Sequence, residues 1–171
     1  KGKALRATKE NRTRYETTRI PSERTRFHVA LGNFRSGVMV EKALADALSG
    51  PLRPQEIFTI PRSLADSEVL RDRTWRWLRK NHRTIVQKIP PFFLSDLPYF
   101  AECCYERRIE EASFFFSSSE TNLPGTQEEL AKVRDSIRDC VSLRQREGPV
   151  VARYLIQLAQ AQPATGAVPA R

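Results

Sequence analysis

Apolar residues recur every three or four positions along nearly the whole chain, the spacing that gathers them on one face of an α-helix. The segment 37–51 shows this most clearly, because its apolar residues form a single stripe: Val40, Ala43, Leu44, Ala47 and Leu48. The stripe stops at Gly50 and Pro51, a pair that ends helices. No stretch gives a convincing alternation of apolar and polar residues, the pattern of a strand. The sequence therefore predicts an all-α fold.

The segment 72–90, DRTWRWLRKNHRTIVQKIP, places two tryptophans one residue apart among many basic residues. We predict a helix from Asp66 to about Lys80. Trp77 falls on its inward face, and Trp75 lies off that face by roughly 150° to 200° at about 100° per residue. We interpret both as helix packing, because aromatic residues at helical spacing usually pack. An exposed Trp75 beside the cations would instead suit stacking with nucleic-acid bases.

The second half of the chain carries its own helix boundaries. Thr126 and Glu129 form a capping-box pattern that predicts the start of a long helix. Gly148 and Pro149 predict its end and the start of a final short helix. Short helices joined by short turns are typical of a bundle or of a curved, HEAT-like stack of antiparallel helix pairs. No fixed-period repeat in the sequence decides between these two.

Most of the chain is predicted to form one domain, since 171 residues suffice for one good core. We place a single helical domain at 15–162, after a basic leader or partial helix at 1–14. The Ala- and Pro-rich tail at 163–171 is predicted to be disordered. No apolar run approaches the roughly 20 residues that span a bilayer, which disfavours a membrane partner.

The chain carries 29 basic and 20 acidic residues, which gives a net charge of +9. Such an excess raises the affinity for polyanions and acidic surfaces, and it does not specify a fold. Because most charge runs are solvated helix faces, the excess alone identifies no partner.

Three cysteines, Cys103, Cys104 and Cys140, bear on the compartment. Their odd number predicts reduced, inert thiols in a cytoplasmic protein rather than a disulfide framework. Pairing of the two sequence neighbours would need a strained local ring. A zinc site is disfavoured as well, because no His pair or further Cys pair completes four ligands.

Residue patterns typical of catalytic sites are missing from the sequence. The two histidines lie in no metal-ligand spacing, and we expect His28 at the core boundary and His82 at the surface. Acidic and basic residues are mixed at 106–111, which predicts a salt-bridged helix surface rather than paired catalytic acids. We predict no catalytic residue, metal or cofactor in this chain.

The order and spacing of four segments along the chain form a pattern that can be compared with known families. The segments are ERTRFHVALGNFRSGVMVEKALADALSG, LRPQEIFTIPRSLADS, RTWRWLRKNHRTIVQKI and AKVRDSIRDCVSLRQREGPVVARYL. Together they resemble the C-terminal helical domain of gluzincin zinc aminopeptidases, the family of aminopeptidase N and the endoplasmic reticulum aminopeptidases. The resemblance covers most of the chain, 15–160. Glu56, Pro61 and His82 depart from the family pattern, which usually has Asp, a continued helix and Trp at these places.

The resemblance implies a fold and a role. The fold is a curved stack of antiparallel helix pairs that caps a peptide chamber and is inactive alone. In this family a separate upstream domain of the same polypeptide binds one zinc ion through His-Glu-x-x-His and a distant Glu. The implied reaction of the parent is attack of metal-activated water on the first peptide bond of a peptide substrate. None of those residues is carried over to this chain.

The resemblance also implies that Arg53 and Gln55, with Arg62 behind them, face the peptide cavity. Cationic side chains there would attract acidic side chains or the C-terminal carboxylate of a peptide. The alternative is structural, with Arg53 capping a neighbouring helix and Gln55 bonding to backbone groups.

Two alternatives from other classes stay open at this point. One is a stand-alone helical-repeat module that binds a protein or an acidic polymer. The other is a basic nucleic-acid binder that uses the Trp75 region, for which binding would weaken steeply with salt. The packing interpretation of the tryptophans disfavours a nucleic-acid partner.

Overall fold

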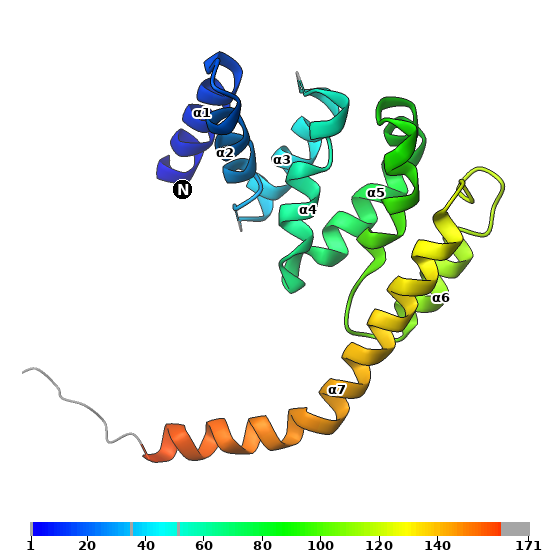
Figure 1. Cartoon of the computed structure of the whole chain (residues 1–171). Helices are drawn as coiled ribbons and strands as arrows, with labels where there is room; N and C mark the ends of the chain where they lie inside the picture. Colours follow the sequence, from blue (N-terminus) through cyan, green and yellow to red (C-terminus); the bar gives the residue numbers. More distant parts are fainter. Residues whose placement is uncertain (1, 35, 51, 162–171) are drawn as a thin grey trace, which may run out of the picture.

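The computed structural model of the chain describes residues 2–34, 36–50 and 52–161, and every regular element in these ranges is a helix (Figure 1). The elements are α1 (Gly2–Thr17), α2 (Pro21–Leu31), α3 (Gly37–Ser49), the 3-10 helix η1 (Pro54–Glu56), α4 (Thr59–Ala65), α5 (Glu68–Lys88), the 3-10 helix η2 (Pro91–Ala101), α6 (Arg107–Phe115) and α7 (Thr126–Ala161). The prediction of an all-α fold is confirmed. Among the helices of the described ranges, none combines the length and the apolar character needed to cross a bilayer.

The helices follow one another along a curved row, from α1 and α2 at one end to α6 and α7 at the other (Figure 1). α1 packs on α2, α4 touches α2, α3 and α5, and η2 packs on α5, α6 and α7. Assignment of this row to the HEAT-like class stays a prediction. The predicted domain boundary at residue 15 falls inside α1, and the tail at 163–171 lies outside the described residues.

Helix α5 is buried on two opposite sides, one for each tryptophan. Trp75 is 1% exposed, and its ring centroid lies 5.5 Å from that of Phe115 and 6.0 Å from that of Phe116. Trp77 is 8% exposed, and its indole N–H donates to the Leu44 carbonyl of α3 at 3.0 Å. Both tryptophans therefore serve packing, as predicted, and neither presents a free face on which a base can stack.

The expectations for the two histidines are wrong. His82 is 7% exposed, and its ring meets Phe115 edge-on at 5.4 Å. The reason is that α5 continues as far as Lys88, which keeps His82 on a buried face of the helix. His28 is fully buried in α2 rather than at the core boundary. Burial lowers the pKa of both imidazoles, so both are neutral at pH 7.

Helix α7 differs from its prediction in two places. Thr126 is its first residue, and its buried hydroxyl has no hydrogen-bond partner in the described structure. The predicted capping box is therefore absent. A capping residue stands just before the first helical residue, whereas Thr126 is itself the first residue of α7. The predicted break at Gly148 and Pro149 is wrong too, since α7 runs on to Ala161. Pro149 has no N–H for the Gln145 carbonyl, and α7 changes direction in its second half (Figure 1).

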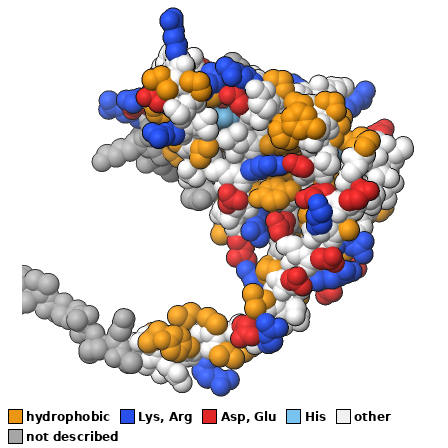
Figure 2. Space-filling view, in the orientation of Figure 1, with side chains coloured by type: hydrophobic (Ala, Val, Ile, Leu, Met, Phe, Trp, Pro, Cys, Tyr) orange, Lys and Arg blue, Asp and Glu red, His pale blue; other side chains and the backbone are white. Residues whose placement is uncertain are grey.

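The second half of α7 projects away from the body of the molecule (Figure 1). Apolar side chains gather on it (Figure 2), and those between 45% and 59% exposed include Val150, Val151, Tyr154, Leu155, Ile156 and Leu158. Over the body, on the face seen in Figure 2, basic and acidic side chains are interspersed. The excess positive charge therefore forms no continuous basic patch on that face (Figure 2).

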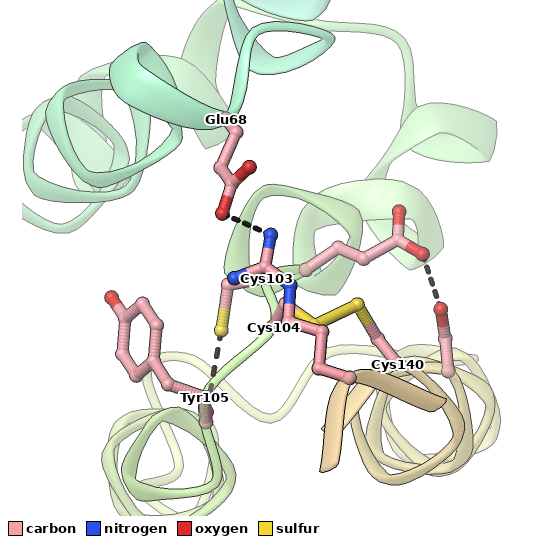
Figure 3. Close-up of a disulfide and its surroundings, with 8 residues drawn as sticks. Glu68, Cys103, Cys104, Tyr105 and Cys140 are labelled. Atoms are coloured by element: carbon pink, nitrogen blue, oxygen red, sulfur yellow. Dashed lines mark hydrogen bonds and ion pairs between the residues drawn. A yellow bond between two sulfur atoms is a disulfide. The ribbon is translucent and has the colours of Figure 1, made fainter. Parts of the chain in front are cut away.

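The prediction of three reduced cysteines is wrong. Cys104 and Cys140 form a disulfide, with their Cα atoms 5.3 Å apart (Figure 3). The bond joins the turn before α6 to helix α7, with 36 residues of sequence separation. Of the three cysteines, one is left as a free thiol. That thiol, Cys103, is buried and donates to the Tyr105 carbonyl at 3.4 Å. Burial raises its pKa to about 11, which makes it a poor nucleophile at neutral pH.

The disulfide predicts a measurable loss of stability in Cys140→Ser. Closure of a 36-residue loop restricts the unfolded chain, so opening it costs about 4 kcal/mol in the chain-entropy relation. Urea unfolding followed by circular dichroism measures the loss, and Cys103→Ala is the control that keeps the bond.

Thiol alkylation in denaturant provides a second readout. We expect one labelled cysteine without reductant and three after reduction. Three labels without reductant, or equal unfolding free energies for Cys140→Ser and the wild type, would contradict the disulfide.

Candidate functional site

The predicted binding segment 53–55 leads into Glu56, whose carboxylate joins three elements. Glu56 accepts hydrogen bonds from the Tyr15 hydroxyl at 2.9 Å and from Arg24 Nε at 3.2 Å. The backbone N–H of Arg53 adds a third at 2.8 Å. The Arg24 guanidinium also lies over the Tyr15 ring, 4.0 Å from its centroid. Because these residues belong to α1, α2 and η1, the network ties the start of the row together.

The charge states of this network follow from its hydrogen bonds. Burial by itself raises the pKa of Glu56, but the hydrogen bonds from Arg24, the Arg53 backbone and Tyr15 outweigh it and lower that pKa to about 2. Burial and the neighbouring Glu56 raise the pKa of Tyr15 to about 12. At neutral pH an ionised carboxylate thus meets a neutral phenol and a guanidinium. The network stabilises the fold, and it holds no group that titrates near pH 7.

Arg62, in α4, lines a surface hollow of about 390 Å³. Its Nη2 lies 2.6 Å from Asp96 Oδ2, and its guanidinium lies 5.5 Å from the Tyr99 ring centroid. Asp66 and Glu129 also line the hollow, so its lining carries three carboxylates and one guanidinium. This charge balance favours a cationic ligand group, whereas the sequence predicted that Arg62 attracts carboxylates.

The three predicted residues are not gathered into one site. The lining of the Arg62 hollow includes neither Arg53 nor Gln55. Arg53 enters the Glu56 network through its backbone N–H, and both its side chain and that of Gln55 are exposed. The two side chains are thus accessible to a ligand, and their contact with a peptide stays a prediction.

A fully buried charge lies between α5 and α6. The Arg108 side chain is 3% exposed, with Nη2 2.5 Å from Asp72 Oδ1 and Nε 3.2 Å from Glu111 Oε2. Its guanidinium lies 5.5 Å from the Trp75 ring centroid. The predicted salt-bridged surface at 106–111 is therefore wrong for Arg108, because its whole side chain is buried and its guanidinium pairs with Asp72 of α5.

A family model described as the ERAP1-like C-terminal domain matches residues 7–139 of the chain. The chain belongs to this family. It is also similar to a curated protein of Saccharomyces cerevisiae named "Aminopeptidase 2, mitochondrial", at 24% identity over 130 residues. That alignment covers 74% of this chain and 13% of the yeast protein. The family resemblance inferred from the four sequence segments is confirmed.

The ERAP1-like C-terminal domain match includes the Glu56 network, the Arg62–Asp96 pair and the buried Arg108. It ends just before Cys140, so one half of the disulfide and the exposed part of α7 lie beyond the matched region. Over the described part of this ERAP1-like domain, His, Cys, Asp and Glu form no group of three or more that could hold a metal ion.

Sequence reasoning missed the contact partners of two charged residues in the ERAP1-like domain, the half-buried Glu56 and the buried Arg108. In the segment LRPQEIF, Glu56 was noted only because the family usually has Asp at that position. Its partner Tyr15 lies 41 residues away and carries no local signal of the contact. Arg108 was recognisable as a charge beside acids, but its burial depends on the packing of α6 against α5.

The low pKa of Glu56 predicts an acid-dependent loss of stability. The folded value of about 2 lies below the unfolded value of about 4.3, so Glu56 stabilises the fold above the unfolded pKa. This contribution is lost as pH falls through the folded pKa. We expect Glu56→Gln to lower the free energy of unfolding at pH 7 by roughly 2–3 kcal/mol and to flatten its pH dependence between about pH 4.5 and pH 2.

Urea unfolding at several pH values measures both effects. Glu10→Gln is the matched control, because Glu10 forms an exposed pair with Arg14 and should change the unfolding free energy by less than about 0.5 kcal/mol. Equal losses in the two variants would contradict the role assigned to Glu56.

Proposed function

We propose that this domain forms the non-catalytic wall of a peptide chamber in a zinc-dependent aminopeptidase that removes N-terminal residues from peptides. The observation that carries the proposal is the ERAP1-like C-terminal domain match over residues 7–139. It is supported by the similarity to a yeast protein named as an aminopeptidase. This chain spans 13% of that relative, which leaves ample length for a separate catalytic part in such a protein.

In this proposal the zinc and the catalytic residues belong to an upstream domain of the same polypeptide. The described residues offer no ligand set for a metal, so no catalytic step is assigned to them. The domain acts by enclosing the peptide and binding its distal part, and it has no hydrolytic activity alone. When bound, the zinc ion would supply an activated water in the catalytic domain.

The substrate contacts divide between two surfaces of opposite character. Arg53 and Gln55 are exposed and suit acidic side chains or a C-terminal carboxylate. The acidic hollow around Arg62 suits a basic side chain of the peptide. Charge complementarity at these two places would select among peptides of sufficient length.

The competing proposals have less support. A stand-alone interaction module does not account for the similarity to a small part of a much longer yeast protein. A nucleic-acid binder needs exposed aromatic side chains, and Trp75 and Trp77 are both buried. A cytoplasmic location stays a prediction, and its argument from reduced cysteines no longer holds because Cys104 and Cys140 are paired.

The proposal predicts a substrate-length effect in the full-length enzyme. We expect Arg53→Ala to raise KM for a long peptide with acidic residues near its C-terminus by about threefold to tenfold, or roughly 0.7–1.4 kcal/mol. Because the lost contact binds substrate and transition state equally, kcat should not change. Hydrolysis of a short aminoacyl chromogenic substrate should stay unaffected.

Arg26→Ala is the control, since Arg26 is another exposed arginine outside the predicted site. An unchanged KM in Arg53→Ala would remove Arg53 from the substrate contacts. Absence of any zinc-dependent aminopeptidase activity in the full-length protein would overturn the proposed function itself.

A further inference from the structure

A second hollow, of about 320 Å³, lies between α3 and α5 and is separate from the Arg62 hollow. Apolar side chains of Leu44, Leu48 and Trp77 form part of its lining. The Trp77 indole N–H donates to the Leu44 carbonyl at 3.0 Å, which fixes α5 against α3 at this place. Asn81 donates from its Nδ2 to the Trp77 carbonyl at 2.8 Å. The apolar lining is therefore held in place before any ligand arrives.

Three cations of α5 surround this lining. Arg73, Arg76 and Lys80 all line the hollow, and their spacing along the helix puts them on one side of it. Glu41 of α3 is the one acidic residue in the lining. Its pair with Arg73, at 3.3 Å, is largely exposed and therefore weak.

The remaining two cations have spare binding capacity. Arg76 uses its Nε for the Asp72 carbonyl at 3.1 Å, which leaves its terminal nitrogens for another acceptor. Neither Arg76 nor Lys80 forms an ion pair within the ranges that the structure describes. A guanidinium with free terminal nitrogens binds a carboxylate in a bidentate way. The lining as a whole is thus electropositive around an apolar centre.

We propose that the α3–α5 groove binds an acidic peptide segment in an extended conformation. Alternate residues of an extended peptide point to the same side, about 6.6–7 Å apart. In such a peptide, two acidic residues four positions apart lie about 13 Å from one another along the backbone, with an apolar residue midway between them on the same side. The helix rise from Arg73 to Lys80 is about 10.5 Å, within reach of these long side chains. The carboxylates meet the cations, and the apolar side chain packs on half-buried Leu48 and on the small exposed part of Trp77, since Leu44 is only 1% exposed.

An acidic peptide fits this groove better than a nucleic acid does. Trp77 is 8% exposed and its N–H is already used, so no base can stack on it as on an open platform. A phosphate backbone offers no apolar group to pack on the apolar centre of the groove, whereas a peptide can place an aliphatic side chain there. The inference does not depend on the proposed function, because its test uses the 171-residue chain alone.

The test is fluorescence anisotropy of a labelled peptide, acetyl-Glu-Ser-Leu-Ser-Glu-amide, titrated with the chain. We expect saturable binding that weakens at least fivefold between low and high salt, because the contacts are ionic. A peptide with Lys in place of both Glu should bind at least tenfold more weakly. Replacement of the central Leu by Ser should weaken binding severalfold.

Two variants locate the binding. Arg76→Gln and Lys80→Gln should each weaken it at least fivefold, while Arg83→Gln, an exposed cation of α5 outside the hollow, should not change it. Thermal unfolding checks that all three variants stay folded. Equal effects of Arg76→Gln and Arg83→Gln would overturn the proposal, as would tighter binding of a single-stranded oligonucleotide that Arg76→Gln weakens. Complete competition by millimolar inorganic phosphate would reduce the site to a nonspecific anion site and would overturn it too.

Discussion

The burial of helix α5 on two opposite sides is the constraint on which the rest of the structure depends. Trp75 and Trp77 are two positions apart and point about 200° from one another around the helix. One side packs on the phenylalanines of α6 and its C-terminal end, and the other packs on α3. A helix buried in this way cannot lie at the edge of a fold. It is therefore a middle layer, and the elements before and after it must cover its two faces.

Charges that are partly or fully buried then fix how the outer layers meet this middle layer. Glu56 holds α1 and α2 to η1 through Tyr15 and Arg24, and Arg108 holds α6 to α5 through Asp72. Such groups are costly to bury alone, so each specifies one arrangement in which its partners are in reach. The Cys104–Cys140 bond does the same covalently for α7. Beyond this anchor α7 carries exposed apolar side chains, so packing against the rest of the described chain does not support it there.

What the sequence predicted well depends on local pattern. The all-α class, the stripe and end of α3 and the packing of Trp77 follow from spacing and from Gly50. What it missed depends on contacts between distant residues or on competition between local signals. The partners Cys104 and Cys140 are 36 residues apart. Pro149 does not end α7, because the helix continues past it with a change of direction (Figure 1). The site was only partly predictable, since Arg53, Gln55 and Arg62 came from family likeness, and the acids around Arg62 emerge only in three dimensions.

The central claim is that this domain works as part of a longer aminopeptidase. The most direct measurement is the mass of the native polypeptide, detected in an extract of the source cells with an antibody raised against this domain. The account predicts a species much larger than 19.6 kDa that carries zinc-dependent aminopeptidase activity after immunoprecipitation. A species of 19.6 kDa alone, with no larger band, would contradict it and would leave the groove between α3 and α5 as the main guide to what the chain binds.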